Sequence, residues 1–165
     1  MAEYNFNEDI ILGEEGEQIV VKDLESLGGK LISDNKDNKY DLQMDMPVRG
    51  CLSTVIYDTK TYEVKTDVFC KPHQDTGNMF IEFECRGKFS GINVTKSEWF
   101  VMYFKHFDEL WYIKTEKLKS IIKDNDFKIT EFSGDSGSNT KGYLIPRYQF
   151  KTKFKVRLVP KKWLS

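Results

Sequence analysis

The sequence of 165 residues is poor in cysteine, and it lacks both a long apolar run and a basic leader. Its three cysteines, Cys51, Cys70 and Cys85, are an odd number without the spacing of a disulfide framework, which favours a reducing compartment. No segment is long and apolar enough to cross a bilayer, and the acidic start does not have the pattern of a secretory signal. We therefore expect a cytoplasmic protein that is not associated with a membrane.

The charge of the chain is nearly balanced but unevenly distributed. The formal net charge is −1, yet residues 141–165 carry eight Lys or Arg side chains and no acid, whereas residues 1–140 carry 17 basic and 26 acidic side chains. A basic segment with interspersed aromatic residues is typical of a surface that binds a polyanion. Lysines that protect a solvated edge strand produce the same pattern, so the sequence leaves both interpretations open.

Length and periodicity predict one domain over residues 1–165, with a core over about 10–125 and a basic, β-rich extension over about 126–165. Apolar residues at helical spacing predict helices over 13–29 and 115–125, the first with a glycine stop. Alternating patterns and turn residues predict strands over 30–33, 40–44, 78–85, 98–104 and 110–115, a hairpin over 53–67 with its turn near 58–60, and a loop over 131–142. The fold class is therefore α/β (α+β), with a mixed central sheet flanked by helices.

The stretch TYEVKTD, residues 61–67, places a carboxylate and an amine two residues apart in a predicted strand. Because side chains alternate along a strand, Glu63 and Lys65 share one face while Tyr62 and Val64 share the other. A Glu-x-Lys pair also occurs on the wet face of many ordinary strands. Further acidic residues elsewhere in the chain are needed before the pair indicates a catalytic site.

Two such acidic residues precede the pair. Glu17 shares the apolar face of the first predicted helix with Val20, Val21 and Leu24, where a carboxylate is costly unless it is paired or bound to a cation. It can also be read as an acid that stabilises the start of a helix. Asp41 lies in a short strand 22 residues before Glu63.

The order of helix Glu, strand Asp and then Glu63-Val64-Lys65 resembles the PD-(D/E)XK nuclease superfamily, in particular archaeal-type Holliday-junction resolvases and small phage endonucleases. The acidic strand, turn and aromatic strand over 79–103 resemble phage members of that superfamily. Two features depart from its pattern: no proline precedes Asp41, and the stretch between Asp41 and Glu63 is longer than in compact resolvases. The resemblance implies a restriction-endonuclease-like αβββαβ core with extra C-terminal strands.

The resemblance also implies roles for the site residues. Asp41, Glu63 and the backbone carbonyl of Val64 are expected to bind Mg²⁺, for which Mn²⁺ substitutes, since phosphodiester hydrolysis needs divalent cations held by oxygen ligands. Lys65 is expected to orient the attacking water, to help deprotonate it, or to stabilise the developing charge. Glu17, or alternatively Glu14, is expected to hold a metal-bound water or a second ion. The role of Glu82 on the following strand stays open.

We therefore expect a magnesium-dependent endodeoxyribonuclease that cuts branched DNA as a homodimer and that acts in the host cytoplasm if it is phage-encoded. The aromatic-rich strands and the basic C-terminal segment are the surfaces expected to serve pairing and DNA binding. Phosphate contacts are expected from basic and hydroxyl residues in two segments: Arg86, Lys88, Ser90, Thr95, Lys96, Lys151, Lys153 and Lys155. The alternatives are a sequence-specific restriction-type endonuclease and an inactive DNA-binding module of the same fold.

Overall fold

The computed structural model describes residues 6–34, 40–49, 54–133 and 139–164. The fold is α+β with a mixed central sheet, as the sequence predicts. Its helices are α1 (Phe6–Ser26), α2 (Thr115–Lys123) and α3 (Arg147–Phe150), with 3-10 turns η1 (Gly91–Asn93), η2 (Lys105–Phe107), η3 (Lys151–Lys153) and η4 (Lys161–Trp163). Its strands are β1 (Lys30–Ser33), β2 (Leu42–Arg49), β3 (Val55–Asp67), β4 (Asn78–Cys85), β5 (Lys88–Phe89), β6 (Trp99–Phe104), β7 (Glu109–Lys114), β8 (Lys128–Ser133), β9 (Asn139–Pro146) and β10 (Lys155–Leu158).

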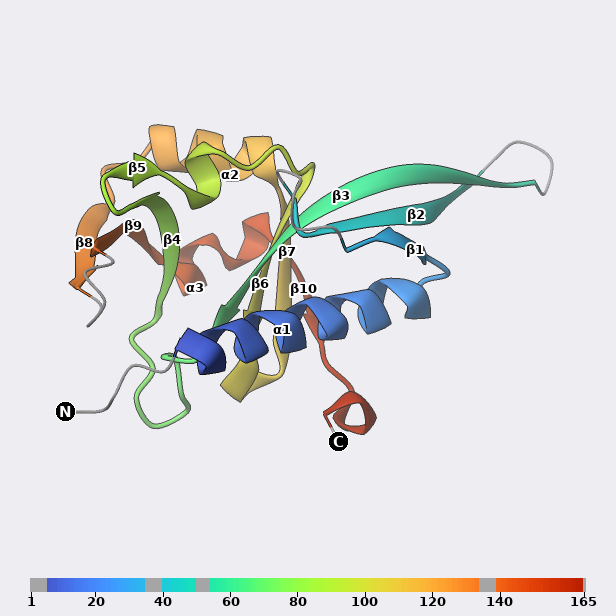
Figure 1. Ribbon diagram of the computed structural model, residues 1–165, viewed down its shortest axis with the longest axis horizontal. Helices are drawn as coiled ribbons and strands as arrows, with labels where there is room; N and C mark the ends of the chain where they lie inside the picture. Colours follow the sequence, from blue (N-terminus) through green and yellow to red (C-terminus); the bar gives the residue numbers. More distant parts are fainter. Residues whose placement is uncertain (1–5, 35–39, 50–53, 134–138, 165) are drawn as a thin grey trace.

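The strands form two sheets (Figure 1). The larger sheet has the order β1-β2-β3-β6-β7-β10, in which β3 and β6 run parallel and every other pair is antiparallel. The smaller sheet has the order β5-β4-β9-β8 and is antiparallel throughout. The chain therefore leaves the larger sheet after β3, builds part of the smaller sheet, and returns beside β3 as β6.

Each face of the larger sheet buries its own apolar core. On one face α1 contributes Ile19, Val20 and Leu24, which pack on side chains of β2, β3, β6 and β7. On the other face the smaller sheet and α2 pack on Phe100, Met102, Trp111 and neighbouring residues of β6 and β7. The segment after residue 126 contributes to both cores, because Ile145 and Phe154 are buried in the second and Val159 is buried in the first.

The first helix ends where the sequence predicts its glycine stop. Gly28 has a φ of +87°, its N–H donates to Glu25 O at 2.9 Å, and the Gly29 N–H donates to Leu24 O at 3.0 Å. These two bonds satisfy the last carbonyls of the helix, as in a Schellman motif. The helix begins seven residues earlier than predicted, at Phe6.

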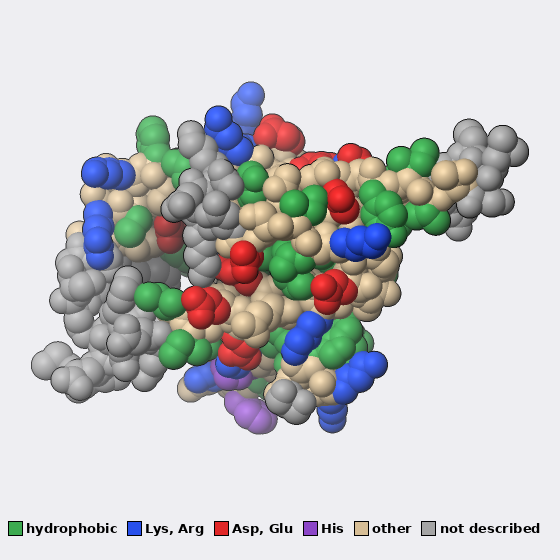
Figure 2. All heavy atoms as spheres, turned by 45° about the vertical axis from the view of Figure 1, so that its right-hand side comes forward, with side chains coloured by type: hydrophobic (Ala, Val, Ile, Leu, Met, Phe, Trp, Pro, Cys, Tyr) green, Lys and Arg blue, Asp and Glu red, His purple; other side chains and the backbone are tan. Residues whose placement is uncertain are grey.

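The predicted turn near residues 58–60 is wrong. Residues 55–67 form one continuous strand, β3, and its residues 55–62, which include the expected turn, pair with β2. The polar residues that suggested a turn have partners within β2 and β3. Lys60 contacts Asp58 at 2.6 Å, and Thr59 donates to Asp45 at 2.6 Å. The outer halves of β2 and β3 project from the body as an arm, visible at the right of Figures 1 and 2, with exposed apolar side chains such as Ile56 and Tyr57.

The order of elements departs from the αβββαβ core in one place. Between β3 and its parallel neighbour β6 the chain forms β4, β5 and η1, where that core has a helix. The predicted loop over 131–142 is also too long, because β8 extends to Ser133 and β9 begins at Asn139. Among the described residues, no helix is both long and apolar enough to span a membrane.

Candidate active site

Glu63, Val64 and Lys65 lie in β3 where the strand enters the body and begins to pair with β6. Val64 packs in the core beneath α1, so by strand alternation Glu63 and Lys65 point to the opposite face. Lys65 Nζ lies 2.8 Å from Glu63 Oε1. Glu63 is only 8% exposed, whereas the Lys65 side chain is 39% exposed. A buried carboxylate is therefore joined to an amine that reaches solvent.

Asp41 lies directly before β2 and bonds to β3. Its N–H donates to Tyr62 O at 2.9 Å, and its Oδ2 accepts the Val64 N–H at 2.7 Å. The backbone pairing of β2 with β3 begins only at Leu42. The Asp41 carboxylate therefore takes the place of the backbone carbonyl that would accept the Val64 N–H if the pairing continued. The N–H and C=O of one residue point to the same edge of a strand, so the Val64 carbonyl is directed to the side where Asp41 lies.

The charge of Lys65 follows from its surroundings. Burial lowers the pKa of Lys65, but the negative charges of Glu63, Asp41 and Glu82 raise it by more, and the pKa lies above its ordinary value. Lys65 is therefore an ammonium group at neutral pH. An ammonium can donate hydrogen bonds and stabilise an anion, but it does not accept a proton. Glu82 on β4 lies within electrostatic range of this pair.

Thr95 has a different role from the phosphate contact that the sequence predicts. It is 5% exposed, and its hydroxyl donates to Glu63 Oε2 at 3.0 Å. Such a buried group does not face a DNA backbone. Sequence reasoning missed this contact because it joins residues 32 positions apart, which no local pattern connects.

Glu17 occupies a separate position from the acids on β3. It is half-buried on α1, and α1 covers the face of the larger sheet that bears Val64. Within the described ranges of the chain, no three His, Cys, Asp or Glu side chains are grouped so that they can hold a metal ion. The structure thus brings Asp41 and Glu63 to one strand without joining Glu17, or the exposed Glu14, to them as a third carboxylate ligand.

The oxygen donors beside β3 suit a hard divalent cation. The carboxylates of Asp41 and Glu63 and the Val64 carbonyl are hard ligands on one segment of strand. Mg²⁺ keeps several waters and is commonly bound through one or two carboxylates, and Mn²⁺ accepts the same ligand types. The residues present therefore fit magnesium or manganese.

The predicted DNA contacts over 86–96 surround a tight hairpin. Arg86 and Gly87 have φ values of 52° and 71°, as in a two-residue turn of type I′, and they join β4 to β5. Arg86, Lys88 and Lys96 are exposed, so they remain available for phosphate contacts. Ser90 is not available, because its hydroxyl oxygen is buried.

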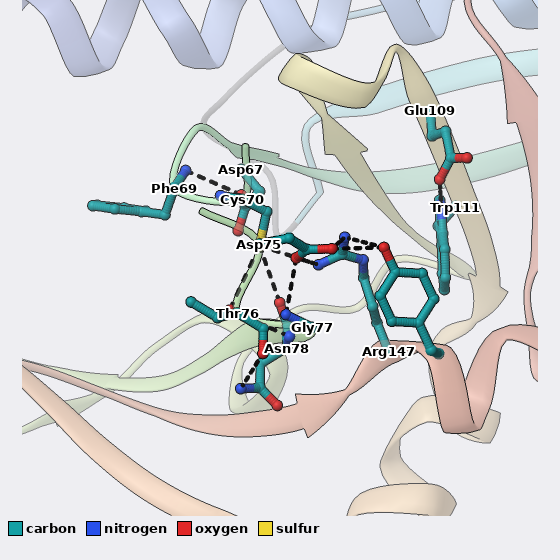
Figure 3. Close-up of polar contacts among 11 residues, drawn as sticks. Asp67, Phe69, Cys70, Asp75, Thr76, Gly77, Asn78, Glu109, Trp111 and Arg147 are labelled. Carbon is teal, nitrogen blue, oxygen red and sulfur yellow. Dashed lines mark hydrogen bonds and ion pairs between the residues drawn. The ribbon is translucent and has the colours of Figure 1, made fainter. Parts of the chain in front are cut away.

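The basic C-terminal segment is partly used for internal ion pairs. Figure 3 shows one of them, in which Arg147 donates to both oxygens of Asp75 at 2.6 Å and also contacts Cys70 Sγ at 3.2 Å. Two further basic residues pair with acids elsewhere in the chain: Lys141 with Glu84 and Arg157 with Asp23. These contacts fasten β9, α3 and β10 to the rest of the protein and remove three positive groups from the surface available to a polyanion.

Lys151, Lys153 and Lys155 are exposed. They lie on η3 and β10, and β10 is the last strand of the larger sheet, beyond β6 and β7 from the acids on β3. Three strand spacings separate the two places, about 14 Å. Both interpretations of these lysines, a DNA contact and a protected edge strand, agree with this position.

Comparisons with models of protein families, with curated proteins and with solved structures find no match to this chain. Function is therefore inferred from the residues of the site.

Proposed function

We propose that the protein is a metal-dependent endodeoxyribonuclease that hydrolyses phosphodiester bonds in branched DNA, with a site of the PD-(D/E)XK kind. One observation carries the proposal. Glu63 and Lys65 form an ion pair on one face of β3, and Asp41 is bonded to the same strand at the Val64 N–H. Two hard carboxylates and an ammonium group thus lie along one short segment of β3, and such groups can bind a cation and stabilise the charge that develops in phosphodiester hydrolysis.

Each residue has a role in this proposal. Asp41, Glu63 and the Val64 carbonyl hold Mg²⁺ or Mn²⁺, which when bound neutralises the phosphate and lowers the pKa of water. Lys65 donates hydrogen bonds to a phosphate oxygen and stabilises the charge that develops there. Arg86, Lys88 and Lys96 hold the DNA backbone without reading its sequence. Glu82 contributes negative potential around the site.

The protein is further proposed to act as a homodimer, since a two-fold assembly matches the cutting of two strands across a junction. The aromatic strands are the wrong surface for pairing, because Phe100 of β6 and Trp111 of β7 are fully buried. A restriction-type endonuclease would use the same site and differ only in its substrate. The inactive module is disfavoured, because Asp41, Glu63 and Lys65 are all present, Glu63 and Lys65 as an ion pair and Asp41 bonded to the N–H of Val64 between them.

A panel of four labelled DNAs tests the proposal: a four-way junction, a flap, a single strand and a matched duplex, each incubated with Mg²⁺ and with a chelator. We expect cleavage that requires the metal and favours the junction. Cleavage of the duplex at one defined sequence would support the restriction-type alternative. Binding of the junction without cleavage of any DNA would indicate the inactive module.

A further inference from the structure

Thr95 lies where the chain returns from the smaller sheet to the larger one. Its N–H donates to Gly91 O of η1 at 3.0 Å, and β6 begins four residues later at Trp99. The return path brings the Thr95 hydroxyl to Glu63 Oε2 at 3.0 Å. The crossover between the two parallel strands therefore delivers a buried hydroxyl to the carboxylate of the candidate site.

The orientation of this hydroxyl is fixed by its neighbours. The Ser97 N–H donates to Thr95 Oγ1 at 3.2 Å, and Ser97 Oγ lies 3.0 Å from the same atom. Thr95 has one proton to donate, and an ionised carboxylate is a stronger acceptor than a serine hydroxyl. We therefore assign Glu63 as the acceptor of the Thr95 hydroxyl proton. The hydroxyl then accepts from the backbone and donates to the carboxylate, so its position is set by the chain rather than by solvent.

The two oxygens of Glu63 consequently have different surroundings. Oε1 faces Lys65 at 2.8 Å on the side open to solvent, and Oε2 faces Thr95 in the interior. A carboxylate that is 8% exposed needs hydrogen-bond partners in the protein to replace its lost hydration. Thr95, itself 5% exposed, supplies such a bond to Oε2.

We propose that Thr95 is a positioning residue, which holds Glu63 Oε2 so that only Oε1 is presented to a cation and which thereby favours Mg²⁺ and Mn²⁺ over Ca²⁺. This inference rests on the proposed function. Mg²⁺ and Mn²⁺ are well served by a single oxygen of a carboxylate, whereas Ca²⁺ accepts both oxygens in a larger and more flexible shell. Residues behind metal ligands typically change metal affinity or activity by about 10- to 100-fold when they are lost.

The test measures Mn²⁺ and Ca²⁺ binding by calorimetry for the wild type and for Thr95→Val, which has the shape of threonine without its hydroxyl. We expect Mn²⁺ affinity to fall about tenfold and the preference for Mn²⁺ over Ca²⁺ to shrink. Thr95→Ser keeps the hydroxyl and is expected to bind as the wild type does. The matched control is Thr115→Val, which deletes a buried hydroxyl that contacts Ser97 Oγ at 3.3 Å and not Glu63. Circular dichroism establishes that each variant is folded, and Thr95→Ala replaces Thr95→Val if the latter does not fold.

Cleavage kinetics on junction DNA provide the second readout. A positioning role predicts that Thr95→Val lowers kcat while KM for DNA stays within about twofold, because Thr95 does not touch the substrate. Wild-type Mn²⁺ affinity and metal preference in Thr95→Val, or an equal loss in Thr95→Ser or Thr115→Val, would overturn the inference while leaving the nuclease intact. A wild type that binds no Mn²⁺ and cuts no DNA would overturn the proposed function, and this inference with it.

Discussion

The contact between Glu63 and Lys65 depends on the geometry of a single strand. Their common face follows from the two-residue period of a strand, so their pairing could be predicted from the sequence. The contact between Asp41 and the Val64 N–H required the register of β2 against β3, which the sequence did not provide. The contacts of Thr95 with Glu63 and of Asp75 with Arg147 join residues 32 and 72 positions apart, and no periodicity relates them.

Loss of the Lys65 side chain is expected to abolish DNA cleavage but not DNA binding. Lys65→Ala removes the only positive group paired with Glu63 among the described contacts, so we expect cleavage to fall at least about 100-fold. DNA affinity and thermal stability should change little, because the amine is half-exposed and outside both cores. The control is Lys60→Ala on the same strand, which contacts Asp58 and Glu98 instead. Equal activity in the two variants would remove Lys65 from the mechanism.

Asp75 is expected to carry part of the acid stability of the fold. Burial raises the pKa of Asp75, but hydrogen bonds from Arg147, Tyr148 and the Gly77 N–H outweigh burial and hold the pKa at about 2. Since this pKa is below its ordinary value, the carboxylate stabilises the fold at neutral pH, and its contribution is lost as the pH falls from about 4 towards 2.

Asp75→Asn should therefore lower the free energy of unfolding at pH 7 by about 3 kcal/mol, because it leaves the buried Arg147 without its charged partner. It should also flatten the loss of stability between pH 4 and pH 2. Urea denaturation across this range measures both effects. Glu116→Gln, which breaks the exposed pair with Lys119, is the control and should cost less than about 1 kcal/mol. A similar loss of unfolding free energy in the two variants would show that the Asp75–Arg147 pair does not carry this stability.

At the scale of elements, the close approach of α1 to β3 depends on a glycine. A Cβ atom placed on Gly16 would lie 2.0 Å from Thr66 Oγ1, so this position accepts a side chain only if Thr66 or the helix moves. Gly13, one turn earlier on the same helix, has no atom within 4 Å of such a Cβ. The two glycines differ in environment although the sequence presents them alike.

Alanine at these two positions should therefore have opposite effects. Gly16→Ala should destabilise the protein by about 1–3 kcal/mol because it forces either the Thr66 side chain or α1 out of its packed position. Gly13→Ala should stabilise it by up to about 1 kcal/mol, since alanine is the better helix former. Chemical denaturation of both variants checks the difference. If Gly16→Ala were as stable as Gly13→Ala, the described packing of α1 on β3 would be incorrect.

The elements that sequence reasoning predicted best are those with a strong local signal. The first helix has apolar residues at helical spacing and a glycine stop, and its end is confirmed at Ser26. The hairpin was misplaced because polar residues at 58–60 look like a turn, whereas their partners lie on β2. The end of β8 and the start of β9 were read as part of a loop over 131–142, since the serine and glycine residues there mask the pairing of the two strands with each other.

At the scale of the whole molecule, the basic residues of the C-terminal segment fall into two groups, one paired with acids inside the fold and one exposed. Lys141, Arg147 and Arg157 form ion pairs within the fold, whereas Lys151, Lys153 and Lys155 are exposed near the far edge of the larger sheet. A DNA that reached the acids on β3 would have to extend across β6 and β7 to meet these lysines. The contribution of the three lysines to binding is therefore expected to be electrostatic and independent of sequence.

Charge reversal of Lys151, Lys153 and Lys155 should weaken binding to all DNA sequences alike and reduce the dependence of log Kd on log salt by about 2 to 3. Fluorescence anisotropy at several salt concentrations measures this slope. The control reverses Lys117, Lys119 and Lys123 on α2, which changes the net charge equally at another place. An identical effect of both triple variants would show that net charge, not this surface, governs binding. No effect of the first would leave these lysines as protection for an edge strand.

The central claim is that Asp41 and Glu63 hold the cation with which the protein cuts DNA. Single-turnover cleavage of a labelled four-way junction by the wild type, Asp41→Asn and Glu63→Gln, purified identically and assayed with Mg²⁺, tests it most directly. The account predicts cleavage by the wild type and a loss of at least about 100-fold in both variants, because each supplies a charged oxygen to one ion. Cleavage at the wild-type rate by both variants, or none by the wild type on this and other DNAs, would contradict it.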